Sequence, residues 1–161
     1  RLLGTGHAIC SVKEQVEINE DVIVWLGDLY VTQDMFSAIK HRTGQNVLTV
    51  GKMPSQHHAH HQVDLDEYQV IRCWNGASQY GDIGLWRLQS GFVSQINNYR
   101  SRRHDEDRAL LLFQNAIDDG TYFGYVKSNS WIHLGGTFPT VEDNIHQVIN
   151  RLIISFICLS T

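Results

Sequence analysis

Short apolar runs separated by turn residues make up the first part of this chain. Residues 22–26 read Val-Ile-Val-Trp-Leu and residues 29–31 read Leu-Tyr-Val, with only Gly27 and Asp28 between them. β-Branched and aromatic residues favour strands, and a two-residue connection that begins with glycine is typical of a hairpin. The pattern therefore predicts a β-hairpin over residues 22–31 that turns at Gly27-Asp28.

Further strands are expected wherever β-branched and aromatic residues gather between turn residues. The segments that fit this description are residues 46–50, 68–74, 83–88, 121–127 and 130–134. The second and third of these are separated by Asn-Gly-Ala-Ser, which predicts that they form an antiparallel pair.

Apolar residues recur at helical spacing in three places. Thr32 is expected to cap a short helix, because threonine is a good N-cap. A second helix is expected from Asp105 through Ile117, ending before Gly120. The third and longest helix is expected over about residues 141–159, where apolar residues follow one another at helical spacing.

Strands in neighbouring pairs, with helices inserted between the groups, are typical of the α+β class. We therefore expect a mostly antiparallel sheet packed by two or three helices, including a long C-terminal helix. Only Pro54 and Pro139 occur in the 161 residues, and no flexible linker is visible, so residues 1–161 are expected to form a single domain.

The end of the C-terminal helix is apolar around nearly its whole circumference. Residues 152–159 read Leu-Ile-Ile-Ser-Phe-Ile-Cys-Leu. One packing neighbour cannot cover side chains that point in all directions around a helix. This helix is therefore expected to pack either against the sheet on several sides or in a homodimer interface.

Charge and composition narrow the classes of partner. The chain has 13 basic and 17 acidic residues, a formal net charge of −4, so nucleic acid is not expected as a partner. No run approaches the roughly 20 apolar residues of a membrane span. Cys10, Cys73 and Cys158 form no CxxC pair, which favours a reducing compartment, and a soluble cytoplasmic protein is expected.

A histidine tract is the strongest candidate for chemistry. His57, His58, His60 and His61 crowd together shortly before Asp64. Neutral imidazole and carboxylate are good ligands for zinc and similar divalent ions. The sequence therefore suggests a metal site with His58, His60, His61 and Asp64 as ligands. The alternative is a polar surface loop that binds metal only adventitiously.

Nucleophile and phosphate-loop signatures are absent: there is no Gly-x-Ser-x-Gly motif and no glycine-rich fingerprint after a strand. The leading hypothesis from sequence is therefore a small binding or interaction domain that acts through a protein partner or a small ligand. The alternative is a metal-assisted, zinc-type hydrolase, with phosphodiesters as candidate substrates, that uses the tract from His57 to Asp64. The catalytic residues are unknown at this stage, and a divalent metal such as zinc is the one cofactor suggested.

Overall fold

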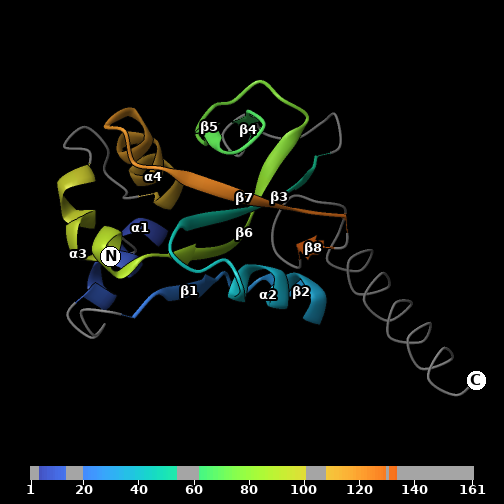
Figure 1. Cartoon of the computed structure of the whole chain (residues 1–161), viewed down its shortest axis with the longest axis horizontal. Helices are drawn as coiled ribbons and strands as arrows, with labels where there is room; N and C mark the ends of the chain where they lie inside the picture. The colour runs from blue at the N-terminus through green and yellow to red at the C-terminus, as the bar shows by residue number, and fades with distance from the viewer. Residues whose placement is uncertain (1–3, 14–19, 54–61, 101–107, 130, 134–161) are drawn as a thin grey trace, which may run out of the picture.

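A mixed sheet forms the centre of the fold (Figure 1). The structure is a computed structural model and describes residues 4–13, 20–53, 62–100, 108–129 and 131–133. Its strands are β1 (Val22–Trp25), β2 (Leu29–Val31), β3 (Asn46–Lys52), β4 (Gln62–Leu65), β5 (Val70–Arg72), β6 (Tyr80–Leu88), β7 (Phe123–Ser128) and β8 (Trp131–His133). Its helices are α1 (Thr5–Val12), α2 (Gln33–Lys40), α3 (Ser90–Gln95), the 3₁₀ turn η3 (Ile96–Tyr99) and α4 (Ala109–Asp118).

The strand order of the main sheet is β5-β4-β6-β3-β7, and β1 also pairs with β6. β6 pairs antiparallel with β3 along one edge. Its other edge is shared: β1 pairs with residues 85–88, and β4 pairs with residues 80–81. β3 and β7 are parallel. β2 and β8 form a separate antiparallel ribbon. The α+β class is therefore confirmed, with a mixed sheet in which one pair of strands is parallel.

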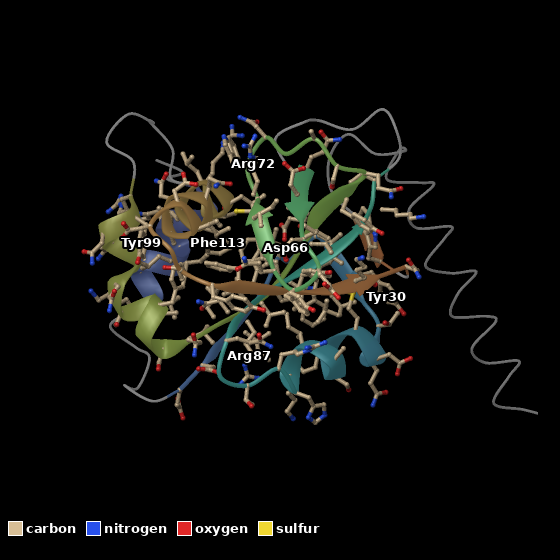
Figure 2. All side chains as sticks on the ribbon, turned by 45° about the horizontal axis from the view of Figure 1, so that its top comes forward. Tyr30, Asp66, Arg72, Arg87, Tyr99 and Phe113 are labelled. Carbon is tan, nitrogen blue, oxygen red and sulfur yellow. The ribbon has the colours of Figure 1, made fainter. Side chains whose placement is uncertain are left out.

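Two apolar cores lie on the two faces of this sheet. The larger core contains Phe113 of α4, whose ring meets Trp86 edge-on with centroids 5.1 Å apart. Figure 2 shows Phe113 between α4 and the sheet. The smaller core is covered by α2, which buries Met35 and Ile39. Each face of the sheet is therefore covered by at least one helix, α4 or α2, that sequence periodicity predicted.

Capping residues explain where α2 and α4 begin or end. Thr32 accepts a hydrogen bond from the Met35 N–H at 3.4 Å, as its N-cap prediction requires. At the end of α4, Gly120 has φ +89°, and the N–H of Thr121 donates to the carbonyl of Ala116 at 2.8 Å. Gly120 in the left-handed conformation and the bond from Thr121 to Ala116 together form a Schellman cap. The predicted end of this helix before Gly120 is therefore confirmed.

The predicted hairpin over residues 22–31 is wrong in its pairing. Both strands exist and a turn joins them, but β1 pairs with β6 and β2 pairs with β8. Neither Gly27 nor Asp28 has a positive φ, which the tight hairpin turns require. The Leu29 N–H instead donates to the carbonyl of Leu26, in a turn that leads the chain away from β1.

The predicted antiparallel pairing of residues 68–74 with residues 83–88 is also wrong. β4 lies between β5 and β6, and it was not predicted because the histidine tract obscures its start. Sequence periodicity also missed α1 and α3, which have eight and six residues. The C-terminal helix over residues 141–159, with the homodimer expected through it, lies outside the described residues and stays a prediction. Within the described ranges, no helix is long and apolar enough to cross a membrane.

Candidate functional site

Three strands of the sheet run toward the same border. β1, β3 and β7 run in one direction and β6 runs in the other. β3 and β7 end beside the start of β6, whereas β1 ends opposite Leu85, partway along β6. The chain passes from β1 to β3 through α2 on one face, and from β6 to β7 through α3 and α4 on the other. Ligands of open sheets bind outside the carboxyl ends of strands, where the connections change face. We take this border as the candidate site.

Asp28 lies just beyond the end of β1 at this border. The turn before it is fixed by two backbone bonds, from Leu26 N–H to the carbonyl of Gly84 and from Leu29 N–H to the carbonyl of Leu26. Asp28 is exposed, and a side chain added at Gly27 would meet no atom within 4 Å. The turn therefore presents a carboxylate beside a stretch of bare backbone, which a ligand could approach closely.

The β2–β8 ribbon closes one side of the border. Leu29, the residue after Asp28, is paired with His133, and Val31 is paired with Trp131. The Trp131 ring lies directly on Gly51, where a Cβ would fall 2.1 Å from the indole nitrogen. The missing side chain at position 51 thus lets β8 fold tightly over the end of β3.

Lys127 supplies positive charge near the end of β7. Its ammonium nitrogen lies 4.8 Å from the ring centre of Tyr80 and 5.3 Å from that of Tyr125. Such cation–π contacts hold a flexible lysine in place without neutralising it. In the described part of the chain, no carboxylate forms an ion pair with Lys127. The arrangement leaves a positioned positive charge that can bind an anion.

The turn between β4 and β5 reaches back over β7 and supports this lysine. The Tyr125 hydroxyl donates to the backbone carbonyls of Asp66 and Glu67, at 3.1 Å and 3.2 Å. Figure 2 shows Asp66 in front of β7. Asp66 accepts the N–H groups of Tyr68 and Gln69, both at 2.7 Å, and these bonds lower the pKa of its carboxyl. The turn that orients Tyr125 is therefore itself well ordered by hydrogen bonds.

A buried acid lies behind the border. Asp82, near the start of β6, is 6% exposed and accepts the Trp86 indole N–H at 2.6 Å. Burial raises the pKa of the Asp82 carboxyl to about 7, although the bonds from Trp86 and the Gly84 backbone oppose this rise. Burial, and secondarily the charge of Asp82, also raises the pKa of the Cys73 thiol. Both groups therefore favour their neutral forms, and neither is exposed to bind a substrate.

Of the four predicted metal ligands, only Asp64 lies in the described residues. His58, His60 and His61 lie outside the described residues, so the metal site stays a prediction. The fourth ligand, Asp64, accepts the N–H groups of Ala77 and Ser78, at 2.8 Å and 2.9 Å. Its second oxygen lies 3.8 Å from the Arg72 guanidinium. Asp64 therefore holds the loop before β6 in place, which is a structural role.

Two tryptophans of the described residues have structural roles. Trp86 is buried in the core, and Trp74 lies under the guanidinium of Arg108 at 5.6 Å. No group of three or more His, Cys, Asp or Glu side chains that could hold a metal occurs within the described ranges. Sequence analysis treated Asp28 only as a turn residue. The signal that it missed is an acid placed three residues after the end of a strand that is apolar on both faces.

Solved structures share this fold. The inositol-1-phosphate CTP transferase from T. maritima matches with a TM-score of 0.67 over 81% of this chain, at 16% identity. A putative glucose-1-phosphate thymidylyltransferase from Bacillus anthracis, in complex with a sucrose, matches with 0.65 over 83%, at 14% identity. HddC from Yersinia pseudotuberculosis matches with 0.63 over 94%, at 18% identity. No family model and no curated protein matches the sequence.

These likenesses establish the fold and correct the function expected from sequence. The chain spans 55%, 56% and 64% of the lengths of those three structures. The hypothesis of a small binding or interaction domain is wrong, and so is its alternative, the zinc-type hydrolase. The two structures with the higher TM-scores are named as a CTP transferase and a putative thymidylyltransferase.

Proposed function

We propose that this chain belongs to an enzyme that transfers a nucleotidyl group to a sugar phosphate or a similar phosphate ester. The fold shared with the T. maritima transferase carries this proposal. A further structure of this fold is a nucleoside-diphosphate-sugar pyrophosphorylase from Vibrio cholerae, with a TM-score of 0.59. Asp28 and Lys127 support the proposal, because they lie at the border where open sheets bind ligands.

The reaction joins two phosphates. A phosphate oxygen of the sugar phosphate attacks the α-phosphorus of a nucleoside triphosphate, the bond to the β-phosphate breaks, and pyrophosphate leaves. Such reactions depend mainly on positioning the reactants and on neutralising the negative charge of the phosphates. The site must therefore offer positive charge to two anionic substrates.

Asp28 is suited to hold a magnesium ion that accompanies the triphosphate. Magnesium is usually bound by one or two carboxylates together with substrate phosphates and water, and it neutralises phosphate charge when bound. A single exposed carboxylate beside the bare backbone of Gly27 fits this pattern. The role of Asp28 is to fix the position of the metal-bound triphosphate against the end of β1.

Lys127 is suited to bind a phosphate of either substrate. The rings of Tyr80 and Tyr125 hold its ammonium group at the border, and no carboxylate of the described residues competes for it. Lys52, at the end of β3, adds a second positive charge at the same border. These residues bind and orient anions, and no nucleophile from the protein is needed.

A product assay tests the proposal. The chain is incubated with magnesium, each of the four common nucleoside triphosphates, and glucose 1-phosphate or inositol 1-phosphate. Pyrophosphate release and the nucleotide-linked product are measured by coupled assay and mass spectrometry. Asp28→Asn should reduce the rate by about 100-fold or more, because it removes a charge that acts on the transition state. The control Asp119→Asn, an exposed acid after α4, should leave the rate unchanged.

Two results together would refute the proposal. One is the absence of pyrophosphate release with every pair of substrates. The other is the absence of binding of any of the four triphosphates in equilibrium dialysis with magnesium. Binding without turnover would retain the site and assign the missing step to groups beyond these 161 residues.

A further inference from the structure

β6 is irregular in the stretch where it lies between β1 and β3. The pairs Leu48–Trp86 and Val50–Asp82 join β3 and β6 on either side of this stretch. Between the two pairs, β3 has one residue whereas β6 has three, residues 83–85. We call this stretch the β6 bulge. Bulges bend a strand, change the direction of its side chains and often lie next to active sites.

Gly84, in the middle of the β6 bulge, supports the turn that carries Asp28. Its φ of +88° lies in the left-handed region that favours glycine. Its carbonyl accepts the Leu26 N–H at 3.0 Å, and a Cβ at position 84 would lie 2.6 Å from the Leu26 side chain. The Leu26 carbonyl accepts the Leu29 N–H at 3.1 Å, which closes the turn around Gly27 and Asp28. The position of Asp28 therefore depends on the shape of the bulge.

Asp82 holds the β6 bulge from inside the larger core. Its carboxyl group accepts the backbone N–H of Gly84 and the indole N–H of Trp86, the latter at 2.6 Å. On the side of β3, the Thr49 hydroxyl donates to the carbonyl of Leu85 at 2.8 Å. A bulge interrupts the regular strand pairing, so its backbone groups need other partners. For the Gly84 N–H, that partner is Asp82.

We infer that Asp82 is a positioning residue for the candidate site, which acts through the β6 bulge and holds the turn that presents Asp28. Gly84 makes the connection, because its N–H donates to Asp82 and its carbonyl accepts from Leu26. Asp82 is only 6% exposed, so it acts on the site without touching a substrate. The inference rests on the proposed function in one respect, namely that Asp28 holds the magnesium ion.

The protonation of Asp82 sets how firmly the bulge is held. Burial raises the pKa of the Asp82 carboxyl to about 7, from the ordinary value of 3.8. If the bulge opens and water reaches the carboxyl, this pKa returns toward its ordinary value. The closed bulge therefore binds the proton more tightly than the open one. The preference for the closed bulge is greatest below about pH 4, and it decreases as pH rises to about 7.

Other ionisable groups lie on the elements around Asp82. In the described part of the chain they are Cys73 after β5, Asp118 of α4, Tyr80 of β6, and Tyr125 and Lys127 of β7. Burial raises the pKa of the Cys73 thiol, so this thiol stays neutral when Asp82 titrates. Lys127 shares a row across the sheet with Asp82, with Val50 between them, at a distance of roughly 10 Å between backbones. A variant at position 82 separates the titration of Asp82 from these groups.

Amide hydrogen exchange of the full chain, without ligand, tests the connection. The protection factors of Leu26 and Leu29 should fall about 10-fold for each pH unit between about pH 5 and about pH 7, because opening releases one proton. The Phe36 N–H, which bonds to the carbonyl of Thr32 in α2, is the internal control and should change much less. Asp82→Asn keeps an oxygen for the donors but cannot ionise, so its turn amides should lose this pH dependence.

Two exchange results would overturn the inference. One is equal pH dependence for Leu26, Leu29 and Phe36, which would show that the whole fold opens rather than the bulge. The other is an unchanged pH dependence of the turn amides in Asp82→Asn. Asn115→Ala is the matched control, because it removes a hydrogen bond of 2.7 Å from α4 to the Tyr99 carbonyl. Its turn amides should keep the pH dependence of the original protein.

Equilibrium dialysis tests the effect on the site, with magnesium and each of the four common nucleoside triphosphates as probes. Asp82→Ala removes the acceptor of both N–H groups, so it should raise Kd by about 10-fold or more through misplacement of Asp28. Asp82→Asn should stay within about threefold of the original protein. An unchanged Kd in a folded Asp82→Ala protein would overturn the inference.

The two measurements separate this inference from the proposed function. If no triphosphate binds to the original protein, the proposed function fails, and the exchange data still decide whether Asp82 holds the turn. If triphosphates bind but the turn amides do not respond to Asp82, the proposed function stands and the inference fails. The exchange comparison within the original protein needs no variant, so it also decides the matter if Asp82→Ala does not fold.

Discussion

Trp86 donates its indole N–H to the carboxyl group of Asp82 at 2.6 Å, inside the layer between the sheet and α4. Asp82 is buried, and no arginine, lysine or histidine among the described residues forms an ion pair with it. A buried carboxylate without a positive partner is costly to ionise. This pair therefore links the stability of the fold to pH.

Stability is expected to fall as pH rises through the range between about 4 and 7. The folded-state pKa of Asp82 is about 7, above the ordinary value of 3.8, so the folded protein holds the proton more tightly than the unfolded chain. The contribution is fully present below about pH 4, and it is lost by about pH 7. Its size is on the order of 4 kcal/mol, at about 1.4 kcal/mol for each unit of pKa shift.

Asp82→Asn provides the comparison, since asparagine keeps an oxygen for the Trp86 N–H but cannot ionise. The free energy of unfolding in urea, measured at about pH 5 and about pH 8, should drop less in the variant than in the original protein. Parallel pH profiles for the two proteins would show that Asp82 does not titrate in this range.

Lys127→Gln is expected to raise KM for a phosphate substrate by about 10-fold to 100-fold. The loss of one charge-assisted hydrogen bond to phosphate costs roughly 1.5–3 kcal/mol. Lys127→Arg should retain most of the affinity, because arginine also stacks on aromatic rings and binds phosphate. The control is Lys40→Gln, at the exposed end of α2. Steady-state kinetics with each substrate varied in turn gives the answer, and unchanged KM values for both substrates would remove Lys127 from the site.

Gly51→Ala should destabilise the fold by roughly 1–3 kcal/mol, the usual cost of overpacking. The new methyl group would lie 2.1 Å from the Trp131 indole nitrogen, so β8 would have to move. Gly91→Ala in α3 is the matched control, because no atom lies within 4 Å of its Cβ position. Thermal unfolding of both variants separates the two cases. A Gly51→Ala protein as stable as Gly91→Ala would show that the indole does not occupy this space.

Gln114→Leu should destabilise the protein by about 1–3 kcal/mol. The Gln114 side-chain oxygen accepts the backbone N–H groups of Cys73, at 2.9 Å, and Trp74, at 3.2 Å. Leucine would remove the side-chain oxygen that both donors share. Asp118→Ala, which removes only the exposed partner of the Gln114 amide, should cost much less. Urea unfolding is the measurement, and similar losses for the two variants would contradict this account.

Short-range sequence patterns correctly predicted those helix and strand ends that depend on residues close together in the sequence. Thr32 caps α2, Gly120 ends α4, and β3 begins at Asn46 as expected. Each of these depends on a side chain and its near neighbours in sequence. The positions of these elements could therefore be predicted without knowledge of the rest of the chain.

Strand pairing could not be predicted in the same way. Residues 22–26 and 29–31 resemble a hairpin, but the partner of β1 is β6 and the partner of β2 is β8, both far along the chain. A one-dimensional pattern gives the strands and their turns, whereas pairing depends on which distant strand buries each face. The candidate site was missed for the same reason, because Asp28 and Lys127 gain meaning only when β1 and β7 are known to be parallel.

The central position of β6 has a consequence for the synthesis of the chain. Asp21, next to β1, is ion-paired with Arg87 of β6, and the two residues are 66 positions apart. At roughly 5–20 residues per second on a ribosome, β1 must wait about 3 to 13 s before its partner emerges. During that time β1, which is apolar on both faces, lacks its partner strand. We therefore expect β1 to be open to pairing with other chains until β6 has been made.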